Sequence, residues 1–150
     1  MTFLTRRSLI LGSIVAVSLL PMKLPAHAVQ TLEIYKTPWC GCCTAWADQM
    51  REAGFPIAVT VIEDIEPLKA KAGVPADLAS CHTAFIEGYV VEGHVPANEI
   101  ARLLEERPRA TGLAVAGMPM GSPGMEVDGP ADAFEVILFS PAGRMVFARY

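Results

Sequence analysis

The cysteines place the strongest constraint on this chain. Of the four in its 150 residues, Cys40, Cys42 and Cys43 stand almost side by side. The fourth, Cys81, is followed directly by His82. Thiols this close either form disulfides or share soft metal ions, and both uses require a set geometry. The rest of the chain is best understood as the scaffold that brings these two short segments together.

The first three cysteines stand where a strand is predicted to end and a helix to begin. Residues 31–36 are rich in β-branched and aromatic side chains, which predicts a short strand. From about residue 42 to residue 53, apolar positions recur three and four apart, which predicts a helix. Free backbone N–H groups and the helix dipole at such an N-terminus favour negative charge. Thiols there lose their protons more easily and become better nucleophiles and metal ligands.

The spacing of the three thiols predicts a shared metal site. Cys40 and Cys43 form a C-x-x-C pair, which in a strand-to-helix context is typical of thioredoxin-like redox sites. Cys42 changes this, because neighbouring residues on a helix point about 100° apart and cannot both chelate one small ion. Crowded thiolates favour bridged ions, and Cu(I) is the first choice, with zinc or an iron–sulfur centre as alternatives. Structural disulfides are a further alternative, since four cysteines allow three pairings.

Residues 1–28 have the pattern of a cleaved signal peptide. A basic pair, Arg6-Arg7, precedes an apolar stretch at residues 9–20 and a small-x-small cleavage site at Ala26-His27-Ala28. The arginine pair also resembles a twin-arginine translocation signal. The apolar stretch is short for a membrane anchor, which is the minor alternative. We therefore expect residues 29–150 to form a single exported domain without a membrane segment after cleavage.

Charge argues against a nucleic-acid partner. The chain has 16 acidic residues against 12 lysines and arginines, and three of the basic residues lie in the predicted signal. No basic stretch follows, so we expect no nucleic acid to bind. The sequence also lacks an evident Ser-His-Asp set, phosphate loop or pair of carboxylates. Hydrolase and kinase functions therefore have no support.

The order of the predicted elements indicates an α/β fold. Residues 57–62 form a β-branched run that predicts a buried strand, parallel to the first. A short helix, a two-stranded hairpin and a longer helix are then predicted at residues 66–72, 85–91 and 96–106. The resulting β-α-β-α-β-β-α order is that of the thioredoxin and glutaredoxin folds. A Gly- and Pro-rich loop and a hairpin within residues 135–150 follow, and we expect them to extend or cap the sheet.

The predicted hairpin places Cys81 and His82 in this fold. Phe85-Ile86-Glu87-Gly88 resembles the second half of a glutaredoxin, where a cis-proline precedes the hairpin and faces the C-x-x-C thiols. His82 stands where that proline would be, with Cys81 just before it. We therefore expect an imidazole and a fourth sulfur to point at the first three cysteines. The same change argues against ordinary disulfide exchange.

Three further features have weaker support. Met118, Met120 and Met125 stand in the Gly- and Pro-rich loop, where packing onto the domain is favoured over contact with copper. His94 follows the second hairpin strand, and a turn-capping role is favoured over a ligand role. Trp39 precedes the first cysteine and is expected to shield the site from water and oxidants.

Four segments together, at residues 39–43, 80–83, 88–96 and 117–125, are similar to those of CopG-type copper-resistance proteins. The resemblance covers almost all of residues 29–150. It implies a thioredoxin-like fold and copper handling in the bacterial periplasm, with cysteines that hold Cu(I) in a cluster of more than one ion. Carried to this chain, it implies that the metal ligands are Cys40, Cys42, Cys43, Cys81 and, with less support, His82.

Three functions follow from these residues. The leading hypothesis is a periplasmic protein that sequesters Cu(I) or changes its redox state. An enzyme alternative is a thiol–disulfide oxidoreductase, in which Cys40 attacks and Cys43 resolves a mixed disulfide. The third alternative is a metallochaperone that delivers copper to another copper-handling protein. The sequence does not separate storage, delivery and redox cycling.

Overall fold

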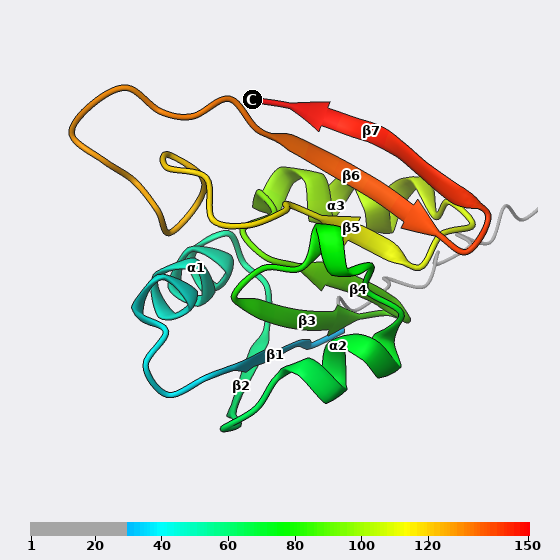
Figure 1. Cartoon of the computed structure of the whole chain (residues 1–150), viewed down its shortest axis with the longest axis horizontal. Coiled ribbons are helices and arrows are strands. Elements are labelled where there is room, and N and C mark those ends of the chain that lie inside the picture. Colours follow the sequence, from blue (N-terminus) through cyan, green and yellow to red (C-terminus); the bar gives the residue numbers. More distant parts are fainter. Residues whose placement is uncertain (1–29) are drawn as a thin grey trace, which may run out of the picture.

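The computed structural model describes residues 30–150. The predicted signal peptide at residues 1–28 lies outside this part of the chain, and so do its twin-arginine pair and cleavage site. Residues 30–150 form a mixed α/β structure with a single seven-stranded sheet and three α-helices (Figure 1). Within the same residues, no helix combines the length and apolarity that a membrane span requires.

The first elements follow the predicted order β-α-β-α-β-β-α. They are β1 (Leu32–Lys36), α1 (Gly41–Glu52), β2 (Ile57–Val61), α2 (Glu66–Ala72), β3 (His82–Ile86), β4 (Tyr89–Glu92) and α3 (Ala97–Glu106), with a single 3₁₀ turn, η1 (Ala76–Leu78), before β3. The C-terminal hairpin is also present, as β6 (Glu135–Ser140) and β7 (Gly143–Arg149). It extends the sheet, which was one of the two expected roles.

A short strand that was not predicted, β5 (Gly112–Ala114), joins the hairpin to the rest of the sheet. The strand order is β2-β1-β3-β4-β5-β6-β7. β5 pairs parallel with β4 and antiparallel with β6. Only glycine fits at its first position, because a Cβ on Gly112 would lie 1.8 Å from the carbonyl oxygen of Val90. Three residues are too few to show a strand period in the sequence.

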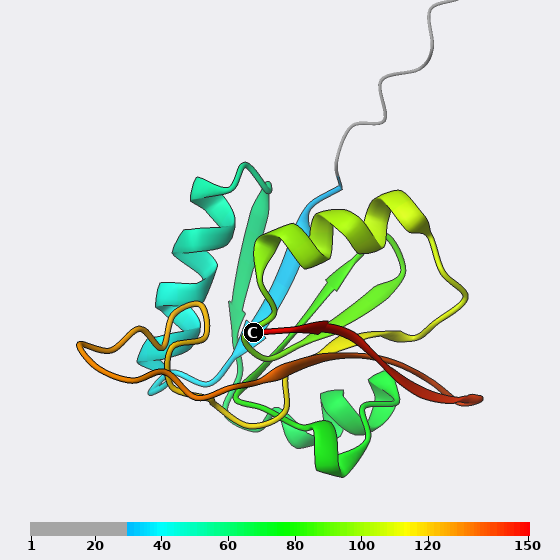
Figure 2. The same cartoon turned by 90° about the horizontal axis from the view of Figure 1, so that it is seen from above.

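The helices cover the two faces of the sheet unequally. α1 and α3 lie on one face, and α2 and η1 lie on the other (Figure 2). The larger core lies under α1 and α3, where Trp46 and Met50 pack with Ile100 and Leu103. The smaller core, under η1, contains Leu78 and Phe139. Each residue of the central strands therefore faces one of two distinct interiors.

The prediction that residues 57–62 form a buried strand is wrong in its burial. β2 does pair parallel with β1, as expected. However, it is the edge strand of the sheet, and both Val59 and Val61 are exposed. A run of β-branched residues stabilises the extended backbone wherever it lies, so it does not distinguish a central strand from an edge strand.

Candidate metal centre

The turn between β1 and α1 presents three sulfurs at a helix N-terminus. Cys40 is the N-cap residue, with extended backbone and no side-chain cap, and the helix begins at Gly41. Cys40 and Cys43 form a disulfide, whereas Cys42 is a free thiol. The Sγ atoms of Cys40 and Cys42 are 3.5 Å apart. The C-x-x-C pair therefore adopts its oxidised form here, with a third sulfur beside it.

Strand pairing brings Cys81 to this turn. β1 and β3 run antiparallel, with Lys36 opposite His82. The chain that leaves β1 and the chain that enters β3 therefore meet at the same end of the sheet. Cys81 Sγ lies 3.4 Å from Cys43 Sγ and 3.8 Å from Cys42 Sγ. The expectation that Cys81 lies against the first three cysteines is confirmed. The Sγ atoms of the four cysteines all lie within 4.8 Å of one another.

His82 faces the same sulfur from the interior. Even-numbered residues of β3 point toward α1, so the ring packs on Trp46 with centroids 4.4 Å apart. Its Nδ1 lies 3.4 Å from Cys81 Sγ, and its buried Nε2 has no hydrogen-bond partner within residues 30–150. Burial lowers the pKa of His82 well below its ordinary value, and the nearby His94 and Lys69 lower it further. The imidazole is therefore neutral at neutral pH and keeps a lone pair, as a metal ligand must.

His94 belongs to the site, although the sequence favoured a turn-capping role for it. Its Nε2 lies 3.0 Å from Cys81 Sγ, and its Nδ1 lies 2.8 Å from the carbonyl oxygen of Pro123. A carbonyl oxygen only accepts hydrogen bonds, so Nδ1 carries the proton and donates. Nε2 of the neutral ring then points its lone pair at Cys81. Burial lowers the pKa of His94, which favours this neutral form.

The signal for His94 was present in the predicted hairpin. A two-residue turn at Glu87-Gly88 places Ile86 opposite Tyr89. From there, each residue earlier in β3 pairs with the residue one position later in β4. Continuing this count beyond the paired residues places Cys81 opposite His94. The register of a short hairpin is therefore sufficient to identify this residue as a neighbour of Cys81.

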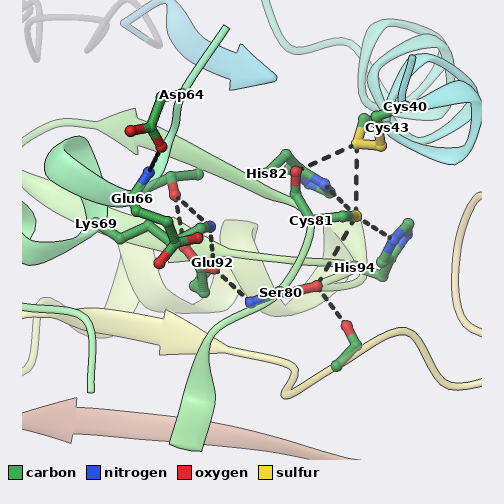
Figure 3. Close-up of polar contacts among 12 residues, drawn as sticks. Cys40, Cys43, Asp64, Glu66, Lys69, Ser80, Cys81, His82, Glu92 and His94 are labelled. Atoms are coloured by element: carbon green, nitrogen blue, oxygen red, sulfur yellow. Dashed lines mark hydrogen bonds and ion pairs between the residues drawn. A yellow bond between two sulfur atoms is a disulfide. The ribbon is translucent and has the colours of Figure 1, made fainter. Parts of the chain in front are cut away.

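We call Cys40, Cys42, Cys43, Cys81, His82 and His94 the sulfur–imidazole cluster. Cys81 is its centre, with the disulfide of Cys40 and Cys43 above its sulfur in the view and the rings of His82 and His94 on either side (Figure 3). Burial, together with the neighbouring Cys42 thiol, raises the pKa of Cys81 to about 12. The thiol is therefore protonated at neutral pH when no metal is bound, and a metal ion has to displace that proton.

The loop after β5 contacts the cluster through its backbone. Pro123 supplies the carbonyl that orients His94. Gly124 has a φ of +83°, and a Cβ there would lie 2.7 Å from the backbone nitrogen of Trp46 and 2.8 Å from the carbonyl oxygen of Cys42. Only glycine allows the loop to approach the first turn of α1 this closely.

The expectation that the methionines pack onto the domain is wrong for two of the three. Met118 and Met120 expose 52% and 42% of their surface, whereas Met125 is half-buried. Trp39 is 71% exposed, and shielding of the sulfurs by its ring stays a prediction. Trp46 closes the inner side of the cluster instead, fully buried and with its Nε1 donating to the Val95 carbonyl oxygen at 2.9 Å.

A second buried polar group lies on the opposite face of β3 and β4. Glu92 accepts hydrogen bonds from Lys69 Nζ at 2.5 Å, from Thr83 Oγ1 at 2.7 Å and from the Ser80 backbone N–H at 2.6 Å. Burial raises the pKa of Glu92, and Lys69 opposes this rise. We call Lys69, Ser80, Thr83 and Glu92 the charged network (Figure 3). It holds the backbone directly before Cys81.

The donor atoms of the cluster suit a soft metal ion. Two groups have metal-binding geometry: the four cysteines, and Cys81 with His82 and His94. Tetrahedral metal–thiolate bonds of about 2.3 Å place two sulfurs about 3.8 Å apart, close to the separation of Cys42 and Cys81. Both groups contain Cys81, which can therefore bridge two ions. The sheet and the cluster thus define an α/β protein with a cysteine–histidine site able to bind metal.

Comparison with known proteins gives the family. The solved structure of copper resistance protein CopG, form 1, is 40% identical and matches with a TM-score of 0.77 over 82% of this chain and 98% of that chain. Form 2 is also 40% identical, with a TM-score of 0.76 over 80% and 97%. A family model described as "Protein of unknown function, DUF411" matches residues 78–125. No curated protein matches. The chain belongs to the CopG family of copper-resistance proteins.

Proposed function

We propose that the protein binds Cu(I) in the periplasm as part of copper resistance, with the sulfur–imidazole cluster as its ligands. The observation that carries this proposal is the set of contacts around Cys81 Sγ. That atom lies 3.4 Å from Cys43 Sγ, 3.8 Å from Cys42 Sγ, 3.0 Å from His94 Nε2 and 3.4 Å from His82 Nδ1. Thiolates select Cu(I), and imidazole suits copper as well.

The oxidation state of the cysteines sets how many sulfurs can bind. Cys42 and Cys81 are free thiols, whereas Cys40 and Cys43 are joined. Two electrons and two protons convert that disulfide into two thiols, which then lose their protons to the metal. Full loading with more than one ion therefore requires the reduced protein. A copper centre beside a reducible disulfide also supports a role in copper redox chemistry.

Fold and location belong to the same proposal. The β-α-β-α-β-β-α order and the antiparallel placement of β3 beside β1 support assignment to the thioredoxin-like class. The signal-like residues 1–28 support export by the twin-arginine route, followed by cleavage near Ala28. Residues 29–150 would then act as one domain in the periplasm. Delivery of the bound copper to another protein remains a prediction from the sequence.

Competition for Cu(I) tests this function. The exported protein is purified, reduced without oxygen and titrated with Cu(I) against a coloured Cu(I) chelator. We expect it to remove more than one ion per chain from the chelator. The control replaces all four cysteines with serine, which keeps side-chain size and removes the sulfurs. If the natural protein takes up no more copper than this control, the proposal is rejected.

The disulfide favours a second function, thiol–disulfide exchange with other proteins. Cys40 and Cys43 are joined at a helix N-terminus, as this chemistry requires. Cys40 is the more accessible of the two and would attack the substrate, while the buried Cys43 would resolve the mixed disulfide. A disulfide-reduction assay should then show turnover that Cys40→Ser abolishes and Cys42→Ser leaves intact. Equal turnover in both variants would exclude it.

A further inference from the structure

The disulfide of α1 has a free thiol in contact with its buried end. Cys43 is fully buried, and its Sγ lies 3.4 Å from Cys81 Sγ (Figure 3). A thiol from another molecule would meet Cys40 first, because that residue is partly exposed. Cys81 instead reaches the opposite sulfur of the same disulfide from inside the protein.

His94 is placed to accept the proton of this thiol. Its Nδ1–H donates to the Pro123 carbonyl oxygen at 2.8 Å, which leaves Nε2 as the acceptor, 3.0 Å from Cys81 Sγ. A thiol hydrogen-bonded to an imidazole whose far nitrogen is oriented by a third group is the usual arrangement of an activated nucleophile. A metal-ligating histidine makes the same hydrogen bond through its other ring nitrogen, so this arrangement of His94 serves both metal binding and acceptance of a thiol proton.

We propose that Cys81 is an internal nucleophile that moves the disulfide from Cys40–Cys43 to Cys43–Cys81. As the sulfur attacks Cys43 Sγ, its proton passes to His94 Nε2 in the same step, so no free Cys81 thiolate has to form. The Cys43–Cys81 bond forms as the Cys40–Cys43 bond breaks, and Cys40 leaves as a thiolate. Atoms and electrons balance within the chain, so no outside oxidant or reductant takes part.

The leaving group is favoured by its position. Cys40 is the N-cap residue of α1, where unpaired backbone N–H groups and the helix dipole stabilise a thiolate. Before the exchange, the free thiols are Cys42 and Cys81. After it they are Cys40 and Cys42, whose sulfurs lie 3.5 Å apart in the present structure. The exchange therefore replaces a thiol in contact with two histidines by one at the helix N-cap.

Digestion with trypsin distinguishes a Cys40–Cys43 disulfide from a Cys43–Cys81 disulfide. Cleavage after Lys36, Arg51, Lys71 and Arg102 leaves Cys40, Cys42 and Cys43 in one peptide, residues 37–51, and Cys81 in another, residues 72–102. A Cys40–Cys43 bond stays within the first peptide. A Cys43–Cys81 bond links the two peptides, and mass spectrometry distinguishes these products directly.

The experiment follows reoxidation of the reduced, metal-free protein with one equivalent of oxidised glutathione, stopped at intervals by alkylation. We expect the bond within residues 37–51 to appear first and the link to residues 72–102 to follow. The link should persist in Cys42→Ser, which excludes Cys42 as the partner of Cys81. In His94→Gln the second phase should slow roughly 100-fold, as for loss of a general base.

A double variant, Cys40→Ser/Cys42→Ser, tests whether the two remaining sulfurs can join at all. It should form the Cys43–Cys81 disulfide under the same oxidation while circular dichroism shows that it stays folded. Absence of the peptide link in both this variant and the natural protein would overturn the proposal. An unchanged rate in His94→Gln would overturn the role of His94. Because no copper is present, failure here leaves the proposed copper binding intact, and failure to bind Cu(I) leaves this exchange intact.

Discussion

The two faces of the β3–β4 hairpin bury polar groups in opposite ways. On the α2 face, Glu92 accepts three hydrogen bonds and Lys69 donates to both Glu92 and Thr83. On the α1 face, His82 keeps an unpartnered Nε2 within residues 30–150, and Cys81 contacts other sulfurs and imidazoles. The polar groups on the α2 face have matched donors and acceptors. Those on the α1 face keep lone pairs and thiol protons that are available to other partners.

This difference separates a structural role from a chemical one. Buried polar groups cost free energy unless they are paired, so a fully paired network stabilises one backbone arrangement. The charged network does this for Ser80, the residue before Cys81. In the sulfur–imidazole cluster, by contrast, His82 Nε2 has no hydrogen-bond partner within residues 30–150. One face of the hairpin therefore fixes the backbone before Cys81, and the other carries atoms that could hold a metal ion.

The largest expected effect is on stability, from Lys69→Met. This change leaves the Glu92 carboxylate buried without its positive partner, so the free energy of unfolding should fall by about 3–5 kcal/mol. Urea unfolding measures it. Lys71→Met is the matched control, because Lys71 is exposed on the same helix. Lys69→Met/Glu92→Leu should recover most of the loss, and a loss below about 1 kcal/mol for the single variant would show that the network is not structural.

Next in size is the effect of Cys81→Ser on copper. Serine keeps the shape and removes the sulfur shared by both ligand groups. We expect Cu(I) affinity to fall at least 100-fold, beyond the roughly 10- to 100-fold typical of losing a group that only supports a ligand. The free energy of unfolding of the metal-free protein should change by only about 1 kcal/mol. Thr44→Ala, on the exposed side of α1, is the control, and equal affinity in both variants would contradict a ligand role for Cys81.

A smaller effect should follow from Gly124→Ala. The added Cβ would contact Trp46 and the Cys42 carbonyl oxygen, in a backbone conformation that favours glycine. We expect a loss of about 2 kcal/mol in unfolding free energy and weaker copper binding, because the loop that orients His94 must move. Gly129→Ala is the control, since a Cβ there would have no neighbour within 4 Å. Equal stability of the two variants would show that the loop does not press on α1.

The smallest expected effect is a pH dependence from His82. Its pKa is lowered in the folded protein, so below about pH 6.5 the unfolded chain binds a proton that the folded chain does not. Stability should therefore fall as pH drops through this value, by up to about 1.4 kcal/mol per pH unit for this histidine. Urea unfolding of the metal-free protein at pH 7.5, 6.5 and 5.5 measures the slope. His94, whose pKa burial also lowers, adds to the slope in the same direction, so His82→Gln should reduce the slope without abolishing it. An unchanged slope would mean that His82 is not buried as a neutral ring.

Much of the fold was predictable because its signals are local. Strand and helix periods, and breaker residues such as Gly54 and Gly73, set the order of elements through α3. The position of His82 was predictable too, because residues 85–88 resemble the glutaredoxin hairpin and His82 stands where its proline would be. These features depend on neighbours within a few positions of each other in the sequence.

The features of the fold that the sequence did not predict depend on packing between distant segments. β2 is exposed because no further strand of residues 30–150 pairs with its outer edge, and no pattern within residues 57–61 can reveal this. β5 exists because Gly112 allows its backbone to approach Val90 closely. Trp39 and Trp46 have the same chemistry and lie seven positions apart, yet only Trp46 falls on the buried side of α1. His94 is different, because counting along the hairpin identifies it.

One tryptophan is buried and the other is exposed, so their fluorescence can report on the site. Trp46 is fully buried with its ring 4.4 Å from His82, whereas Trp39 is 71% exposed. Indole emits at shorter wavelength in an apolar interior than in water, and disulfides and protonated imidazoles in contact with it quench its fluorescence. Chemical events around Cys81 should therefore act mainly on the blue part of the emission. The red part, from the solvated indole, provides an internal reference in the same spectrum.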